Sequence, residues 1–296
     1  MAKNFGKEER RVKEILSPGT DFTYDGVVYT VIESGKPTCG KGEPKTDIYI
    51  LASYDEGTKE FKISYKKGNA EFLENKMQPE RAATIFGEDW SDFVQSATAS
   101  IKNAFEEKPL IYKKKYGRTD KGAFTLGWKF ELLNTDNGDY SGSVQLSKDQ
   151  LMEVYAGIKL PESKRNASVN GRKVVNSGVA DYLLFSDNIT CAQDVFDNIM
   201  PLVDYVDDYP EMYFACKALN YRSEKHKWDG NRPLSVFVDW YTENNKLCYR
   251  IVYNRPLNTK GDEVAHKLLA ALEKLGIETV DDINADNLED YRIVYE

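Results

Sequence analysis

Histidine is scarce in this chain, which has only two, His226 and His266, among 296 residues. Zinc centres and sites that work through paired histidines need clusters of such side chains. The four cysteines stand far apart, and no two of them form a Cys-x-x-Cys pair. This spacing predicts reduced thiols and excludes both a disulfide framework and a cysteine-based zinc site. Hydrolytic chemistry in this chain would therefore depend on carboxylates and lysine.

Long hydrophobic runs are also missing. No stretch approaches the roughly 20 apolar residues that a membrane helix requires. The first 16 residues are charged rather than apolar, which does not fit a secretory signal. Together with the reduced thiols, these features predict a cytoplasmic protein with no membrane partner.

An excess of basic residues is absent as well, because the net charge is −8. The acidic excess is uneven: residues 1–115 hold 19 basic and 19 acidic side chains, so the remainder supplies all of it. Contacts to phosphate depend on the local patch rather than on the total charge. The composition thus argues against non-specific coating of nucleic acid, but it permits a local basic groove.

The composition is that of a globular protein, with 41% hydrophobic and 12% aromatic residues. Helical spacing over residues 3–16 precedes two hairpin patterns, at 22–32 and 46–66, and helices are predicted from near residue 70, over 79–86 and over 90–105. This order predicts an α/β fold of the α+β type. We expect a core over residues 1–110, with 111–296 forming the remainder of the fold or continuing the same domain.

The most informative stretch runs from Thr46 to Lys76. Asp47 opens an apolar strand pattern, a turn-rich segment follows, and a second strand carries Glu60, Phe61 and Lys62. Strand side chains alternate, so Glu60 and Lys62 share one face and Phe61 lies on the other. The turn folds the two strands together, and the sequence therefore predicts that Asp47 approaches the face of Glu60 and Lys62.

Two carboxylates and a lysine that converge in this way suit a hard divalent cation. Mg²⁺ prefers oxygen ligands and is often bound by only one or two carboxylates plus water and substrate phosphate. A lysine beside it can neutralise charge that develops on a phosphate, or orient the attacking water. The competing interpretation is a surface hairpin on which Glu60 and Lys62 form an ion pair of little energetic value.

The pattern Thr46-Asp47, twelve residues, Glu60-Phe61-Lys62 resembles the PD-(D/E)XK nuclease superfamily, to which most type II restriction endonucleases belong. Thr46 stands where that family has proline. The resemblance covers roughly residues 1–90 and implies a restriction-endonuclease-like core, with a central mixed β-sheet flanked by helices. It also implies that Asp47, Glu60 and the main-chain carbonyl of Phe61 bind Mg²⁺ and that Lys62 serves the water. A first-helix glutamate often joins the metal site in this family, and Glu8 and Glu9 are both candidates.

The expected function is Mg²⁺-dependent cleavage of double-stranded DNA by a type II restriction endonuclease. A repair, recombination or phage nuclease of the same fold, or a non-catalytic DNA-binding protein, are the alternatives. Whether the chain works as a homodimer, and whether RNA replaces DNA, are left open by the sequence.

The segment Asn220 to Arg232 combines basic, amide and aromatic side chains on one predicted loop. Such residues suit contacts to phosphates and to base edges. We therefore expect DNA contacts here from Arg222, Lys225, Lys227 and Arg232. An ordinary polar surface loop has the same composition and is the alternative interpretation.

Overall fold

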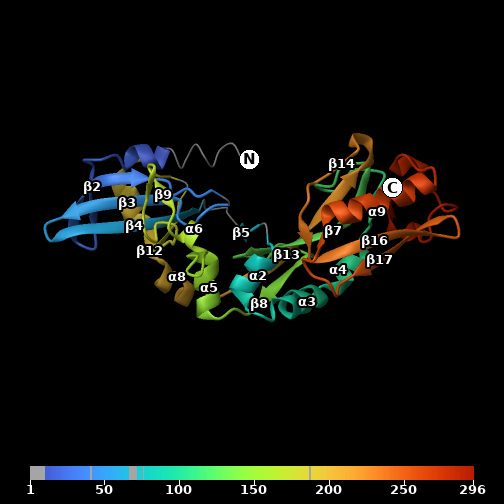
Figure 1. The fold of residues 1–296 in the computed structure, drawn as a ribbon, viewed down its shortest axis with the longest axis horizontal. Helices are drawn as coiled ribbons and strands as arrows, with labels where there is room; N and C mark the ends of the chain where they lie inside the picture. The colour runs from blue at the N-terminus through green and yellow to red at the C-terminus, as the bar shows by residue number, and fades with distance from the viewer. Residues whose placement is uncertain (1–10, 41, 67–71, 76, 187) are drawn as a thin grey trace. The chain divides into compact units, whose positions relative to one another are not determined.

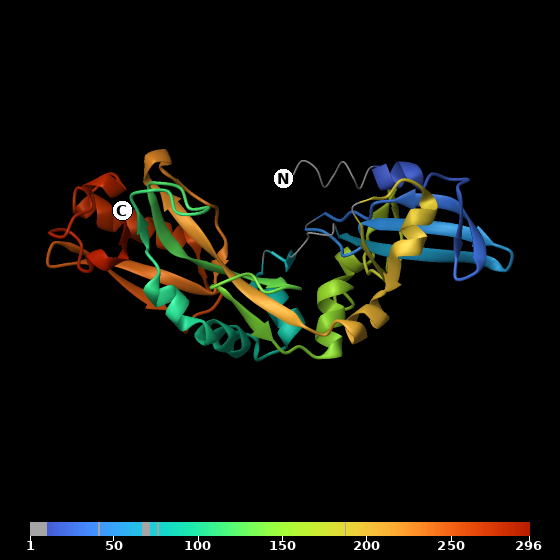
Figure 2. The same ribbon diagram turned by 180° about the vertical axis from the view of Figure 1, so that it is seen from behind.

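The computed structural model describes residues 11–40, 42–66, 72–75, 77–186 and 188–296. These residues form two compact units, each assembled from two separate parts of the chain (Figures 1 and 2). Unit 1 comprises the described residues within 1–71 and 146–210, and unit 2 those within 72–145 and 211–296. The division thus differs from the expected boundary near residue 110: residues 72–110 belong to unit 2, whereas 146–210 return to unit 1.

Unit 1 begins with a helical segment over residues 11–15 and is built around a mixed sheet in the order β1-β2-β3-β4-β11-β12. Its elements are β1 (Asp21–Tyr24), β2 (Val27–Gly35), β3 (Ile48–Tyr54), β4 (Gly57–Lys66), α5 (Lys148–Tyr155), α6 (Glu162–Arg165), β9 (Ser168–Val169), β10 (Arg172–Lys173), β11 (Tyr182–Phe185), α7 (Ala192–Asn198), β12 (Ile199–Pro201) and α8 (Leu202–Asp208).

The neighbouring strands β1 to β4 pair in antiparallel fashion, and both hairpins have the expected turns. Asp25 and Gly26 both adopt positive φ, at 51° and 74°, as a tight two-residue turn requires. Strand β11 then pairs with β4 in parallel. A parallel pair cannot be joined by a tight turn, and the connection from β4 to β11 includes residues 72–145 of unit 2.

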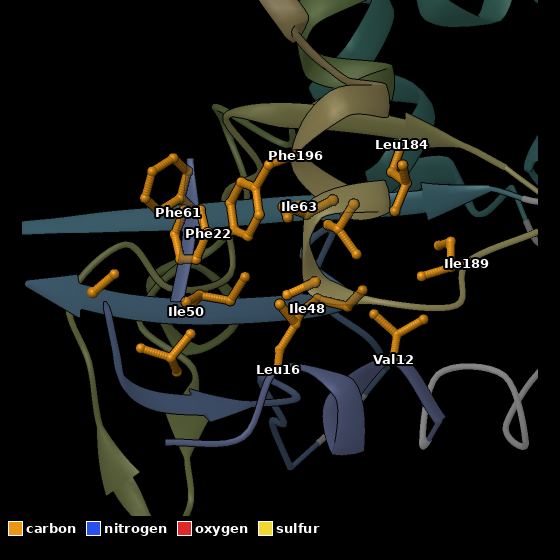
Figure 3. Packing of buried hydrophobic residues seen from close by; sticks show 14 of the residues in the cluster. Val12, Leu16, Phe22, Ile48, Ile50, Phe61, Ile63, Leu184, Ile189 and Phe196 are labelled. Atoms are coloured by element: carbon orange, nitrogen blue, oxygen red, sulfur yellow. The ribbon is translucent and has the colours of Figure 1, made fainter. Parts of the chain in front are cut away.

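The core of unit 1 lies on one face of this sheet, where α7 packs against the strands (Figure 2). The ring of Phe61, which is fully buried, stands near the rings of Phe22 and Phe196, at centroid distances of 5.6 and 5.1 Å (Figure 3). Ile48 and Ile50 from β3 extend the same apolar layer. The alternation along each strand therefore directs the other set of side chains to the opposite face of the sheet.

Unit 2 contains a second, larger sheet with the strand order β14-β13-β7-β16-β17, against which α9 packs. Its elements are β5 (Phe72–Glu74), α2 (Pro79–Phe86), α3 (Trp90–Ser100), α4 (Lys102–Glu107), β6 (Ile111–Tyr112), β7 (Ala123–Leu133), β8 (Ser141–Val144), β13 (Met212–Arg222), the 3₁₀ helix η1 (Ser223–Lys225), β14 (Lys227–Trp228), β15 (Pro233–Leu234), β16 (Val236–Glu243), β17 (Lys246–Val252), β18 (Thr259–Lys260), α9 (Gly261–Lys274), the 3₁₀ helices η2 (Val280–Asp282) and η3 (Tyr291–Ile293), and β19 (Val294–Tyr295).

Two segments that the sequence pattern indicated as helical differ in the structure: one helix is interrupted, and part of the other is a strand. The predicted helix over 90–105 is interrupted at Ile101, because the hydroxyls of Thr98 and Ser100 hydrogen-bond to carbonyls of the preceding turn. Residues 72–74, expected to be helical, form β5 instead, because they pair with β7. Pairing with a distant strand has overridden the local helical pattern.

Within the described residues, no helix combines the length and apolar character needed to span a bilayer.

Truncating Phe61 tests whether the aromatic cluster is the core of unit 1. Phe61→Ala removes a fully buried ring, so we expect the free energy of unfolding to fall by about 3–5 kcal/mol. A denaturant titration measures this. The matched control is Val28→Ala in β2, where the side chain is 63% exposed and the expected change is within about 0.5 kcal/mol. Equal small effects for both variants would place the core elsewhere.

Candidate active site

The register of β3 on β4 decides which predicted residues meet. Ile48 lies opposite Ile63 and Leu51 lies opposite Glu60, so Asp47, one residue before β3, falls at the level of Ser64. The backbone N–H of Asp47 donates to the carbonyl of Ile63 at 2.9 Å. Glu60 is four residues away from Ser64 along β4, about 13 Å at the usual rise per residue. The register therefore separates Asp47 from Glu60 along the ladder, while Lys62 lies between them, two residues from Ser64.

Asp47 has a different lysine beside it. Its Oδ2 accepts a hydrogen bond from the backbone N–H of Tyr65 at 2.9 Å and lies 3.8 Å from the Nζ of Lys66. The side chains of Asp47 and Lys66 are 21% and 26% exposed. A carboxylate and an ammonium thus stand together at the end of the hairpin, and both remain accessible from solvent.

Ser64 occupies the position across the ladder from Asp47. Its side chain is buried, with 1% of the residue exposed, and its Oγ has no hydrogen-bond partner among the residues that the structure describes. A buried hydroxyl without a partner loses its hydration without compensation, and such groups in native proteins call for an explanation. The hydroxyl is sealed from solvent, so among the described residues Asp47 and Lys66, not Ser64, present polar groups to the outside here.

Glu60 and Lys62 belong to a second polar cluster on the same face. The Nζ of Lys62 lies 3.1 Å from Oδ2 of Asp181, and the hydroxyl of Tyr49 donates to Oε1 of Glu60 at 2.5 Å. Tyr49 stands opposite Lys62 in the ladder, and the backbone N–H of Asp181 donates to the carbonyl of Lys62. These side chains therefore bond mainly to one another across β3, β4 and the start of β11.

Burial gives this second cluster its electrostatic character. It raises the pKa of the Asp181 carboxyl, against the opposing effect of the Lys62 ammonium, and the nearby charge of Glu60 raises it further. Burial also raises the pKa of Tyr49, followed by its hydrogen bond to Glu60. The tyrosine consequently stays protonated and remains a hydrogen-bond donor to the carboxylate.

A short hairpin, β9–β10, covers the neighbouring part of this face. Arg172 pairs with Glu33 at 2.7 Å, and Asn170 donates to the same carboxylate. Gly35 permits this close approach, since a Cβ there would lie 2.8 Å from Cγ1 of Val169. The cover leaves Tyr49 only 1% exposed. The second cluster therefore has the character of a structural network more than that of an open site.

The remaining members of the predicted metal site are placed as follows. The side chain of Phe61 points into the apolar core, and the role expected of its carbonyl stays a prediction. Glu8 and Glu9 lie outside the described residues. Among the described residues no group of three or more His, Cys, Asp or Glu side chains could hold a metal ion. Asp47 therefore offers one carboxylate, which is within the range that Mg²⁺ accepts when water and phosphate complete its coordination.

The segment 220–232 is a hairpin of β13 and β14, closed by η1 and by His226 in the left-handed conformation. Arg222 pairs with Asp229 at 2.9 Å, and Lys225 lies 3.5 Å from Asp120.

Lys227 and Arg232 are exposed. Two of the four predicted DNA-binding side chains are thus neutralised by nearby carboxylates, which leaves Lys227 and Arg232 as the better candidates.

Sequence reasoning missed Asp181, Tyr49 and the pairing of Asp47 with Lys66. Asp181 reaches Lys62 only through the parallel pairing of β11 with β4, which has no local signal in the sequence. The sequence did indicate that Lys66 was a candidate, because strand alternation places it on the same face as Glu60, Lys62 and Ser64. Choosing between Lys62 and Lys66 required the register of the hairpin.

No family model matches this chain, and neither the curated proteins nor the solved structures contain a match to it.

Proposed function

We propose that the protein is a Mg²⁺-dependent endonuclease that hydrolyses phosphodiester bonds in double-stranded DNA. The observation that supports this most is the pair formed by Asp47 and Lys66, 3.8 Å apart and accessible at the end of the β3–β4 hairpin. The mixed sheet of unit 1 is compatible with a restriction-endonuclease-like core, and sequence-specific cleavage of the type II kind remains the leading form of the proposal.

The residues around Asp47 fit a magnesium site of the kind that binds few protein ligands. Asp47 would hold the ion through its carboxylate, with water and phosphate oxygens completing the coordination. When bound, Mg²⁺ would polarise the phosphate and lower the pKa of a coordinated water.

The chain itself supplies the positioning and the charge at this site. The backbone N–H of Tyr65 fixes the orientation of the Asp47 carboxylate. Lys66 places a positive charge where negative charge would develop on the phosphate, an arrangement that stabilises a transition state.

This assignment shifts the family pattern by four residues along β4. Ser64-Tyr65-Lys66 repeats the spacing of Glu60-Phe61-Lys62, with serine in the acidic position. The shifted pattern has one carboxylate fewer, but its lysine, Lys66, lies close to Asp47. Both versions keep Asp47, so the choice between them concerns the lysine and the second ligand.

Cleavage of plasmid DNA with and without Mg²⁺ tests the proposal. We expect cutting only with the ion, and none by Asp47→Ala, which loses the proposed metal ligand but retains its DNA-binding surfaces. Asp55→Ala is the matched control, because Asp55 is exposed in the turn of the same hairpin. Fixed bands would indicate sequence reading, whereas cleavage of branched or modified DNA alone would indicate a repair or phage nuclease. Cutting by Asp47→Ala would refute the assignment, and no cutting of any DNA or RNA would favour a non-catalytic binding protein.

The two lysines are separated by comparing their alanine variants in single-turnover cleavage. Lys66→Ala should lower the rate about 10²–10³-fold, as the loss of one charge-stabilising donor does. Lys62→Ala should change the rate far less, because the Lys62 ammonium is already paired with the Asp181 carboxylate. A large loss of rate in Lys62→Ala with a small loss in Lys66→Ala would instead assign the catalytic role to Lys62 and to the pattern Asp47, Glu60-Phe61-Lys62.

Substitution in the β13–β14 hairpin tests the expected DNA contact. Lys227→Ala and Arg232→Ala should each weaken duplex binding and lower its dependence on salt, because each removes a phosphate contact. Arg222→Ala should have the smaller effect on binding, since its partner is Asp229. Unchanged affinity and unchanged salt dependence in both Lys227→Ala and Arg232→Ala would remove this hairpin from the interface.

A further inference from the structure

Unit 2 contains a cavity of about 270 Å³ on the sheet face formed by β6, β7 and β13. Much of its wall is aromatic, and the small side chain of Ala218 contributes to it as well. The four rings that line it are Tyr112, Tyr116, Trp128 and Tyr140. The cavity is too small for a large cofactor, since pockets for drug-sized ligands start near 300 Å³, but it suits a single planar heterocycle.

A bulge in β7 creates this arrangement. Asn220 pairs with Thr125 and Ala218 pairs with Trp128, so one residue of β7 is extra and the alternation shifts. Thr125 and Trp128 consequently face the same side as Ala218 and Asn220. Gly127 makes the bulge feasible, with φ at 154° and only 2.5 Å between a would-be Cβ and the carbonyl oxygen of Val236. Bulges that re-aim side chains in this way are common beside binding sites.

Asn220 supplies a polar group in the wall. The residue is only 8% exposed, and its Oδ1 has no hydrogen-bond partner within the part of the chain that the structure describes. The proposed nuclease chemistry in unit 1 does not involve this amide. A buried acceptor among aromatic rings can be satisfied by a ligand that brings an N–H donor.

The charges at the cavity favour a neutral ligand. Lys108 and Asp139 both line it, and they neutralise each other in an ion pair of 2.7 Å. A methylated ammonium ligand is favoured by the negative potential of surrounding aromatic rings, and the ammonium of Lys108 at this cavity opposes a second cation. A nucleobase with an exocyclic amino group meets these requirements, because it is planar and neutral and can donate an N–H to Asn220 Oδ1.

The segment next to the cavity supports a nucleic-acid strand as the source of that base. Tyr116 is 43% exposed and sits in a tight turn, closed by two backbone hydrogen bonds with Thr119. Lys114, Lys115 and Arg118 flank this ring and are exposed. Basic side chains interleaved with an accessible aromatic ring are typical of surfaces that bind the backbone and stack an unstacked base.

We propose that this cavity receives one unstacked nucleobase with an exocyclic amino group (adenine, cytosine or guanine) from a DNA strand. The ring of Tyr116 stacks on the base, and the amide of Asn220 bonds to its amino edge. Recognition of an extruded base by stacking and by edge hydrogen bonds is how proteins read a nucleotide taken out of the helix. The inference rests on the proposed function in that it takes DNA as the ligand, but it involves none of the residues assigned to cleavage.

Fluorescence anisotropy in EDTA tests the proposal without any cleavage. The probes are a fully paired duplex and the same duplex with one unpaired adenine, cytosine, guanine or thymine. We expect the wild-type protein to bind the adenine, cytosine and guanine duplexes on the order of tenfold more tightly than the paired one, which is within the range of a single base–aromatic stack, and to bind the thymine duplex, which has no amino group, less tightly than these three. Competition by the corresponding nucleoside monophosphates shows whether the free base suffices or whether the strand is needed.

Tyr116→Ala and Asn220→Leu should each remove the preference for the unpaired base. Tyr241→Ala is the matched control, an exposed tyrosine of unit 2 that does not line the cavity, and it should keep the preference. Tyr116 is on the surface, so its variant stays informative even if Asn220→Leu fails to fold. Equal affinity for all duplexes, a preference that survives Tyr116→Ala, or no DNA binding would each overturn the proposal. Metal-dependent cleavage without the preference would overturn the cavity alone, whereas the preference without cleavage would overturn only the nuclease.

Discussion

The pairing register of β3 on β4 is the constraint from which the account of unit 1 follows. Ile48 and Ile50 of β3 and Phe61 of β4 must all lie on the buried face, and a slip of β3 by one residue would turn its two isoleucines to the face opposite Phe61. The same register sends Ser64 and Lys66 to the other face and sets Asp47 at their level. The hydrophobic core therefore determines which polar side chains can act together, although it contains none of them.

Two polar clusters result on one sheet face, and their surroundings differ. Around Glu60 and Lys62, hydrogen bonds and ion pairs connect neighbouring strands, and the β9–β10 hairpin covers part of the area. At the end of the hairpin, Asp47 and Lys66 remain partly exposed beside a buried hydroxyl without a partner. A site that binds a phosphate must be open to solvent, and the location of Asp47 and Lys66 meets this condition.

Local signals in the sequence predicted local structure well. The Asp25-Gly26 turn, the β3–β4 hairpin and the capped start of α5 at Ser147 follow from residue chemistry within a few positions. The long-range pairings did not follow, because the contact of β11 with β4 and that of β13 with β7 join segments about 80 to 120 residues apart. The candidate site shows the same limit: Asp47 was identified from its strand pattern, but its neighbours depended on a register that the turn alone did not specify.

Ion binding by the hairpin gives the most direct test of the central claim, that Asp47 and not Glu60 is the carboxylate of the site. Isothermal titration of Mg²⁺ into the DNA complex of the wild-type protein would be compared with Asp47→Asn and Glu60→Gln. The account predicts that Asp47→Asn abolishes the binding heat while Glu60→Gln retains it. Binding that is lost in Glu60→Gln and retained in Asp47→Asn would contradict the account.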